Sequence, residues 1–413
     1  MTTSFLRILK LFSERHYFYD IFYPWVIHLI FHRVCAIMNT VQGGIFMNPV
    51  SNPVTVSQRN YGIDLLRLVA AFYVIILHIM NRGGLYSATT EYSYQNLLCR
   101  IMLIVTYCAV NIFGIISGYV GYREPLKKIS YNGYLTLWMT VVFYNLLFVG
   151  IYMFLLPGSV TKEDVISVFF PVSSNLYWYF SAFTLVTFFA PFLNRVLYTS
   201  SEKELKLLFL LICCVFTIIE FLKGSFEMNQ GYSAHWLILL YLVGGIMKKT
   251  KIGSRISAPT AILWIILLYL TLFFLDQKVR ILYYPPFIIN FDCKRSYITP
   301  FYLAVAILHV ILFAKFQFHP FFRKLIAFAA PAAFSVYITN TNPLFWKHFM
   351  KDRFVSWSTS SPAGIFVRTI AFSGFFVLAV IFLDFLRQKL FRLIGVHNWS
   401  QKLSGLFHNE KIS

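Results

Sequence analysis

Residues 59–84 read RNYGIDLLRLVAAFYVIILHIMNRGG, and this stretch decides the fold. It is apolar enough to span a membrane, yet it carries Asp64, Arg67 and His78 inside the apolar run. An ionisable side chain at the centre of a bilayer costs roughly 2.5–3.5 kcal/mol on insertion scales, so such residues face a protein interior and point to a functional site. The stretch therefore predicts a membrane helix whose charged side chains face the inside of a helix bundle.

The three ionisable residues are predicted to share one stripe of this helix. At 3.6 residues per turn, His78 lies about 20° and Asp64 about 60° around the helix axis from Arg67. A rise of about 1.5 Å per residue separates Arg67 from His78 by roughly 16 Å, which is about half the hydrocarbon thickness of a bilayer. The side chains are expected to line a path through the membrane, and they need not touch one another.

The composition of the whole chain agrees with a membrane protein. Of its 413 residues, 58% are hydrophobic, 19% are aromatic and only 13% are charged, and the mean hydropathy is +0.66. A soluble domain would carry about 25% charged residues. The net charge of +20 is expected to hold cytoplasmic loops against anionic lipid rather than to bind nucleic acid. The six cysteines show neither a disulfide framework nor the spacing of a metal site, so we expect small apolar fillers.

Ten apolar windows follow one another, each near the ~20 residues that a spanning helix needs. They lie at 61–81, 97–121, 131–156, 176–197, 205–222, 234–247, 259–276, 298–314, 325–346 and 364–386. With both termini inside, the inside segments hold 23 of the lysine and arginine residues and the outside segments hold 11, while Arg67 and Arg368 lie within spans. The positive-inside rule then predicts an all-α polytopic membrane protein of about ten transmembrane helices with both termini cytoplasmic.

Residues 1–58, 59–390 and 391–413 are expected to form an N-terminal extension, the transmembrane domain and a cytoplasmic tail. The extension is basic and aromatic, and its apolar run FYDIFYPWVIHLIFHRVCAIM is interrupted by charged residues and proline. Two interpretations stay open for it: a helix lying in the membrane interface, or a segment upstream of a natural start at Met47. The 277–297 segment is an exception to the charge bias, because it is basic although this topology places it outside. It is a candidate for binding an anionic head group or acceptor.

His78 is the leading candidate for a catalytic base, because the proton affinity of imidazole is poised near neutral pH. Asp64 or another acceptor is expected to fix the tautomer of the ring. Arg67 carries a planar fork of donors that suits a phosphorylated donor substrate, and an ion pair with Asp64 three residues away is compatible with that role. The alternative for His78 is a hydrogen bond to a neighbouring helix for packing alone.

The second window ends in NIFGIISGYVGYREPLKK, residues 111–128, and forms a small-residue face followed by basic residues. Small residues allow another backbone or a thin ligand chain to approach closely. Two interpretations are left open: close helix packing beside a basic cytoplasmic loop, or a channel for the donor. In the second case the donor contacts are predicted at Arg67, Ser117, Gly118, Tyr119 and Arg123.

Two further segments are rich in polar and aromatic residues. Trp178 and Tyr179 in LYWYFSAF are read as part of an aromatic belt at the membrane interface rather than as a pocket wall. The ninth window contains PAAFSVYITNTNPLFW at 331–346, which includes Asn340 and is expected to face the interior. Hydrogen bonding between helices explains its polar residues without catalysis.

With these residues in view, the chain resembles acyltransferase family 3, the integral-membrane O-acyltransferases of bacterial surface polysaccharides. The resemblance rests on the arginine and histidine at Arg67 and His78, with Asp64 upstream in GIDLLR. It is supported by ISGYVGYR, LYWYFSAF, YLVGGIMKK and AAFSVYITNTNP, and it covers about residues 59–390.

The resemblance implies transfer of an acyl group, expected to be acetyl, from cytoplasmic acyl-CoA to a hydroxyl of a cell-surface or cell-wall glycan, with the histidine essential. The implied partners are acyl-CoA, a glycan or lipid-linked glycan acceptor and membrane lipid, in the bacterial plasma membrane and without a permanently bound cofactor. Family members often carry a fused extracellular domain, and this chain is expected to be the stand-alone type. Either the membrane core completes the transfer, or a separate extracytoplasmic transferase does.

Two other functions remain open. In a multi-span transporter or flippase, the stripe of Asp64, Arg67 and His78 would be a substrate or proton path. In a membrane sensor, the same residues would serve packing only.

Overall fold

The computed structural model describes residues 59–124, 126, 130–278 and 296–406, and every regular element in these ranges is helical. The predicted N-terminal extension lies outside the described residues, as does most of the 277–297 segment. The longer helices, in chain order, are α3 (Tyr61–Met80), α5 (Tyr94–Thr106), α6 (Ala109–Gly121), α7 (Asn132–Leu155), α9 (Trp178–Thr199), α12 (Ala234–Thr250), α13 (Ala258–Lys278), α14 (Pro300–Ala314), α15 (Pro320–Ala329) and α18 (Pro362–Leu393).

Shorter helices connect or extend them: α4 (Leu85–Ala88), α8 (Lys162–Phe169), α10 (Glu202–Leu210), α11 (Thr217–Lys223), α16 (Ala333–Thr341), α17 (Pro343–Phe345) and α19 (Val396–Leu406). Turns of 3₁₀ helix lie at Asn229–Gly231, Ala330–Ala332 and Val355–Thr359, and π-helical turns lie at Leu211–Phe216 and Trp346–Met350.

Each of the ten predicted windows falls on a helix or on a series of helices. Within the described part of the chain, seven helical stretches are long and apolar enough to cross a membrane. They are Tyr61–Ala88, Tyr94–Gly121, Asn132–Leu155, Trp178–Thr199, Ala258–Asp276, Pro320–Thr341 and Pro362–Leu393, and Pro300–Ala314 is a shorter apolar helix. The all-helical membrane fold is thus confirmed, whereas the count of ten and the side of the termini stay predictions.

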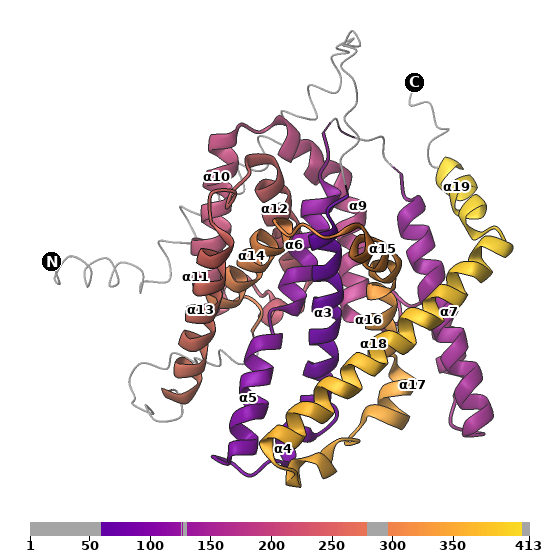
Figure 1. The fold of residues 1–413 in the computed structure, drawn as a ribbon. Coiled ribbons are helices and arrows are strands. Elements are labelled where there is room, and N and C mark those ends of the chain that lie inside the picture. Colours follow the sequence, from indigo (N-terminus) through magenta and orange to yellow (C-terminus); the bar gives the residue numbers. More distant parts are fainter. Residues whose placement is uncertain (1–58, 125, 127–129, 279–295, 407–413) are drawn as a thin grey trace. The chain divides into compact units, whose positions relative to one another are not determined.

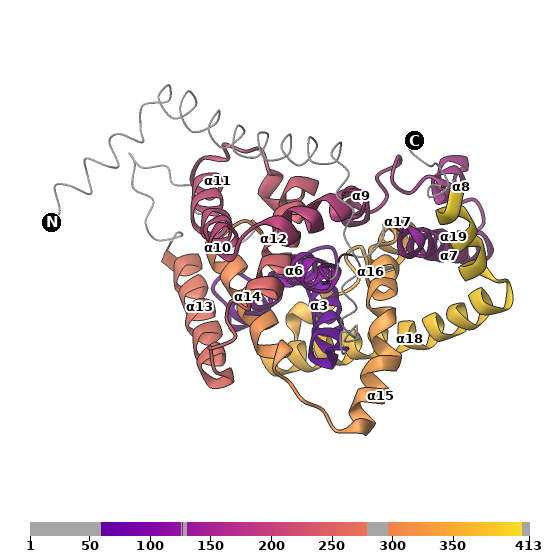
Figure 2. The same cartoon turned by 90° about the horizontal axis from the view of Figure 1, so that it is seen from above.

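Helix α3 lies at the centre of the described bundle. It packs against α5, α6, α14, α16 and α18, and Figures 1 and 2 show it between these helices. Its start is set by Asn60, whose side chain accepts a hydrogen bond from the Ile63 amide at 3.1 Å and donates one to the Ala314 carbonyl at 2.9 Å. A side chain oxygen at this position satisfies an amide that the first helical turn leaves unpaired. Its end is a turn in which Gly84 adopts a φ of 76°, a conformation that glycine adopts without steric cost.

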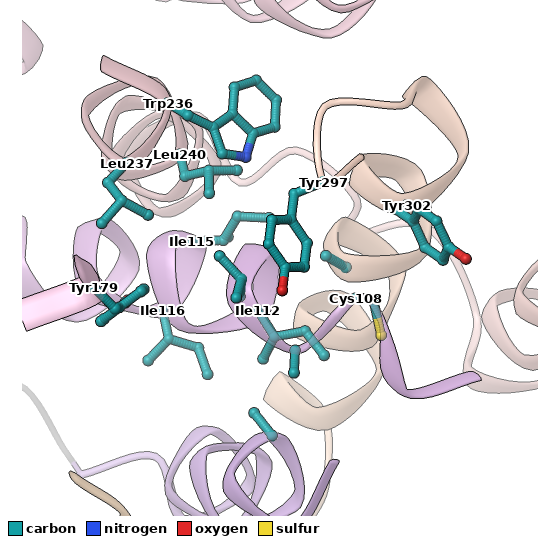
Figure 3. Close-up of a cluster of buried hydrophobic side chains, with 14 of the residues drawn as sticks. Cys108, Ile112, Ile115, Ile116, Tyr179, Trp236, Leu237, Leu240, Tyr297 and Tyr302 are labelled. Atoms are coloured by element: carbon teal, nitrogen blue, oxygen red, sulfur yellow. The ribbon is translucent and has the colours of Figure 1, made fainter. Parts of the chain in front are cut away.

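The small residues of α6 pack directly on α12. A Cβ atom placed on Gly118 would lie 1.8 Å from the carbonyl oxygen of Tyr241, and one on Gly244 would lie 1.9 Å from that of Ile115. Isoleucines of α6 and leucines of α12 fill the rest of this contact, as Figure 3 shows. The two backbones therefore touch because both helices present glycine at the crossing.

The chain after the last predicted span is partly helical. Helix α18 continues to Leu393, and α19 packs against α7. Ser400 of α19 donates a hydrogen bond to the Asn132 side chain at the start of α7. The described part of the predicted tail is thus docked on the helical bundle.

Candidate active site

A cavity of about 710 Å³ runs along α3 and has walls from α6, α9, α16 and the segment that follows α16. This volume is in the range that holds a small-molecule substrate. Aromatic and aliphatic side chains make up most of its lining, and the aromatic ones are Phe113, Tyr177, Trp178, Tyr179, Phe183, Tyr297, Phe334, Tyr337 and Trp346.

The cavity contains both Arg67 and His78, and it extends beyond His78 to Arg82. These residues lie on or just after one helix, so the rise of about 1.5 Å per residue gives the cavity a length of roughly 22 Å along α3. Arg67 and His78 therefore lie in a single cavity, with His78 nearer the Arg82 end, whereas Asp64, which was predicted to line the same path, is not part of the lining.

His78 is held by residues from the far end of the chain. Its Nδ1 atom contacts Oδ1 of Asn340 in α16, and its ring meets Trp346 edge to face at 5.0 Å between centroids. Trp346 in turn donates a hydrogen bond from its indole nitrogen to the Asn340 carbonyl. With the Asn340 amide in this orientation its oxygen accepts, so Nδ1 donates and Nε2 is the nitrogen that can take up a proton.

Arg67 lies in a network at the opposite end of the cavity. Its Nη1 atom donates to Asp64 at 3.0 Å, and Arg59 donates to the other oxygen of the same carboxylate at 2.5 Å. Asp64 is 8% exposed, whereas the side chains of Arg67 and Arg59 are 31% and 47% exposed. One buried carboxylate thus holds two arginines, and the planar donor group of Arg67, which lines the cavity, stays partly open to a ligand.

Asp64 does not reach His78. The two residues are fourteen positions apart on one helix, which corresponds to roughly 21 Å. The acceptor that orients the imidazole is Asn340, so Asp64 positions Arg67 instead. The structure contains the ion pair between Asp64 and Arg67 that their spacing in the sequence allowed.

The predicted donor contacts separate into two groups. Arg67 and Ser117 line the cavity, but Gly118, Tyr119 and Arg123 do not. Gly118 packs on α12, the Tyr119 ring lies 5.0 Å from the Lys248 amine, and exposed Arg123 donates weakly to the Val120 carbonyl. Donor binding through Gly118, Tyr119 or Arg123 stays a prediction without support from the cavity lining.

Several residues of the site did not stand out in the sequence. Trp178 and Tyr179, expected in an aromatic belt, line the cavity, and Asn340, expected to hydrogen-bond between helices, contacts the candidate base. The run of polar residues in AAFSVYITNTNP was the available signal for Asn340, because an intramembrane amide requires a partner. No sequence signal distinguished Trp178 from the many other aromatic residues.

Other buried charges stabilise the surroundings of the site. Asp384 in α18 accepts hydrogen bonds from Tyr144 in α7 and Ser335 in α16, and it pairs with Arg387 at 2.7 Å. Arg100 in α5 pairs with Asp276 in α13. The Asp384 network holds α16, and therefore Asn340, against two neighbouring helices.

These features define a polytopic helical membrane protein with a histidine and an arginine facing one internal cavity. The chain matches the family model described as an acyltransferase domain over residues 60–386, which is most of its length. The protein therefore belongs to the acyltransferase family 3, and the resemblance noted in its sequence is confirmed. It is a multi-pass membrane acyltransferase. Comparisons with curated proteins and with solved structures returned no significant match.

Proposed function

We propose that this protein is an O-acyltransferase of the bacterial plasma membrane. It moves an acyl group, proposed to be acetyl, from acyl-CoA to a hydroxyl of a cell-surface or cell-wall glycan. The single observation that carries the proposal is the position of His78: oriented by Asn340, and in the same cavity as Arg67.

The arginine end of the cavity suits an anionic donor. Arg59 and Arg67 share the single carboxylate of Asp64, so this ion-pair cluster carries a net positive charge, and Arg67 is the member that lines the cavity. Guanidinium groups bind phosphates through paired hydrogen bonds. The predicted bias of lysine and arginine toward the inside supports a cytoplasmic position for this end, where acyl-CoA is made.

The proposed chemistry needs one base and one nucleophile. Nε2 of His78 takes the proton of the acceptor hydroxyl as its oxygen attacks the thioester carbonyl carbon. The new C–O bond forms, the C–S bond breaks, and the proton passes to the leaving thiolate. The roughly 16 Å rise between Arg67 and His78 leaves room for the donor's thin arm between its charged end and its thioester.

The aromatic walls support a glycan acceptor near His78. Trp178, Tyr179, Tyr337 and Trp346 all line the cavity, and flat rings give a sugar an apolar surface on which to stack. Asn175 and Thr341 add hydrogen-bonding groups to the same lining. A few placed polar groups among aromatic side chains are typical of an oriented small-molecule site.

Full-length protein in lipid nanodiscs tests the proposal. With acetyl-CoA and glycan fragments, wild-type protein should release free thiol and produce acetylated glycan detected by mass spectrometry. His78→Ala should do neither, whereas His235→Ala, which changes an exposed histidine at the start of α12, should keep both activities. Wild-type protein that releases no thiol from acyl-CoA would instead agree with the alternative function of a transporter.

A further inference from the structure

The cavity has a second set of cations beyond His78. Arg82, which follows α3, lines this end together with Lys347 and Lys351 from the segment after α17. All three side chains belong to exposed residues, so they lie where the cavity meets its surroundings. We call these three residues the outer rim.

The backbone around the outer rim is ordered by direct contacts. The Arg82 carbonyl accepts a hydrogen bond from the Asp352 amide at 3.1 Å, and the Gly83 carbonyl accepts one from the Phe354 amide at 2.9 Å. The Lys351 amide donates to the Trp346 carbonyl at 3.0 Å, and the Arg82 guanidinium lies 4.8 Å from the Trp346 ring. The backbone segments that carry the cations are therefore held together by hydrogen bonds, and one of them also carries Trp346, whose ring packs against His78.

The outer rim lacks the charge compensation found at the other end. Among the residues that the structure describes, none of its three cations makes an ion pair, although Asp352 is a near neighbour in sequence. The described lining of the cavity includes no carboxylate. Three like charges around one opening repel one another, and an anionic ligand would remove that repulsion.

We propose that the outer rim selects an acceptor glycan that carries a negative charge, either a carboxylate or a phosphate, near the hydroxyl that is acylated. This inference rests on the proposed function, and it narrows the acceptor class. The rim lies on the side of His78 opposite Arg67. A donor bound at Arg67 therefore does not contact these three cations, and they remain available to bind the acceptor. Their exposure also explains how a polymer, too large to enter, presents one charged unit to His78.

Matched acceptors and a triple variant test the proposal. The acceptors are a uronic-acid oligosaccharide with its neutral methyl ester, and a glycerol-phosphate-substituted oligosaccharide with its dephosphorylated form. The protein is the full chain in nanodiscs, as wild type and as Arg82→Gln/Lys347→Gln/Lys351→Gln. The control is Arg353→Gln, because Arg353 is exposed in the same segment but lies outside the cavity lining.

The wild type should prefer one or both anionic acceptors, and the pair that shows the preference identifies carboxylate or phosphate. The triple variant should raise the acceptor KM by about 10- to 100-fold, because removing one exposed ion pair changes an equilibrium by up to about fivefold. The KM for acetyl-CoA should not change. Added salt should weaken the preference of the wild type. Arg353→Gln should behave as the wild type.

Two results would overturn the inference while leaving the proposed function intact: equal use of the charged and neutral acceptors, or a rise in the KM for acetyl-CoA instead of the acceptor. Binding of fluorescently labelled oligosaccharides, measured without donor, keeps the test independent of catalysis. If no acceptor is acylated, the proposed function fails, and binding still decides whether the rim selects anions. Arg82→Lys/Lys347→Arg/Lys351→Arg, which conserves the charges, should retain the preference and controls for folding.

Discussion

The two ends of the cavity carry similar charges but balance them differently. At one end Arg67 shares the buried carboxylate of Asp64 with Arg59, so the protein itself supplies the counter-charge. At the other end His78 contacts the neutral amide of Asn340, and the cations of the outer rim have no ion-pair partner among the described residues. The protein itself therefore supplies a counter-charge at the first end, whereas the second end combines the proposed base with cations that lack such a counter-charge in the described part of the chain.

The largest expected effect follows removal of the proposed base. His78→Ala should lower the transfer rate by about 10²- to 10⁴-fold, the range for a lost general acid or base. Acetylated product measured in nanodiscs checks this, with His235→Ala as the control. Transfer at the wild-type rate would show that the His78 end is not the reactive one.

The next largest effect is expected from Arg67, which pairs with Asp64. Arg67→Gln should raise the KM for acyl-CoA by about 10- to 100-fold, because hydrogen bonds to charged groups contribute about 1.5–3 kcal/mol. Arg59→Gln is the matched control: it removes the other arginine on Asp64, but Arg59 does not line the cavity. If both variants changed the KM equally, the ion-pair network as a whole would matter, and not the position of Arg67 in the cavity.

A smaller effect is expected from the partner of the base. Asn340→Ala should lower kcat by about 3- to 10-fold, since it removes one hydrogen bond that orients His78, and it should leave both KM values unchanged. In His78→Ala protein the same change should have no further effect on kcat, because the two residues act as a unit. Asn194→Ala, which removes an asparagine that links α6, α9 and α12 away from the cavity, is the control. An additive loss in the double variant would contradict the positioning role.

The smallest effect on catalysis should come from Gly118, the neighbour of the cavity residue Ser117. A Cβ atom at Gly118 would overlap the Tyr241 carbonyl, so Gly118→Ala should lower the free energy of unfolding by about 1–3 kcal/mol while the KM for acyl-CoA stays the same. Thermal unfolding in detergent measures the first quantity. Gly150→Ala, at a position with no atom within 4 Å of the new Cβ, should be neutral. A raised KM for acyl-CoA without loss of stability would instead support a role for Gly118 in donor binding.

Much of the fold follows from apolar patterning, because a membrane helix must be about 20 residues long and its boundaries appear as changes in polarity. The window 61–81 and helix α3 agree to within one residue. Interruptions were harder to predict. The window 97–121 breaks between α5 and α6, and the ninth window divides into α15, α16 and α17, because short turns inside a bundle cost little apolar length.

The sequence alone predicted some of the site residues and missed others. Arg67 and His78 stood out because charge is rare inside a span, and Asp64 stood out with them. Asn340 is 262 residues away from His78 in the chain, and no spacing rule links the two helices. Arg82, Lys347 and Lys351 resembled ordinary loop cations, since their common opening exists only when the turn after α3 packs on the segment after α17.

The sequence by itself determined that the chain is a helical membrane protein, that it resembles the family to which it belongs, and that one helix carries Asp64, Arg67 and His78. These properties depend on hydropathy and on helical periodicity, which are local. Only the tertiary structure decided that Asn340, rather than Asp64, orients His78, that the glycines of α6 serve packing, and that the cations of the outer rim meet at one opening. Each of these depends on which helices pack together, and shape complementarity between distant segments decides that.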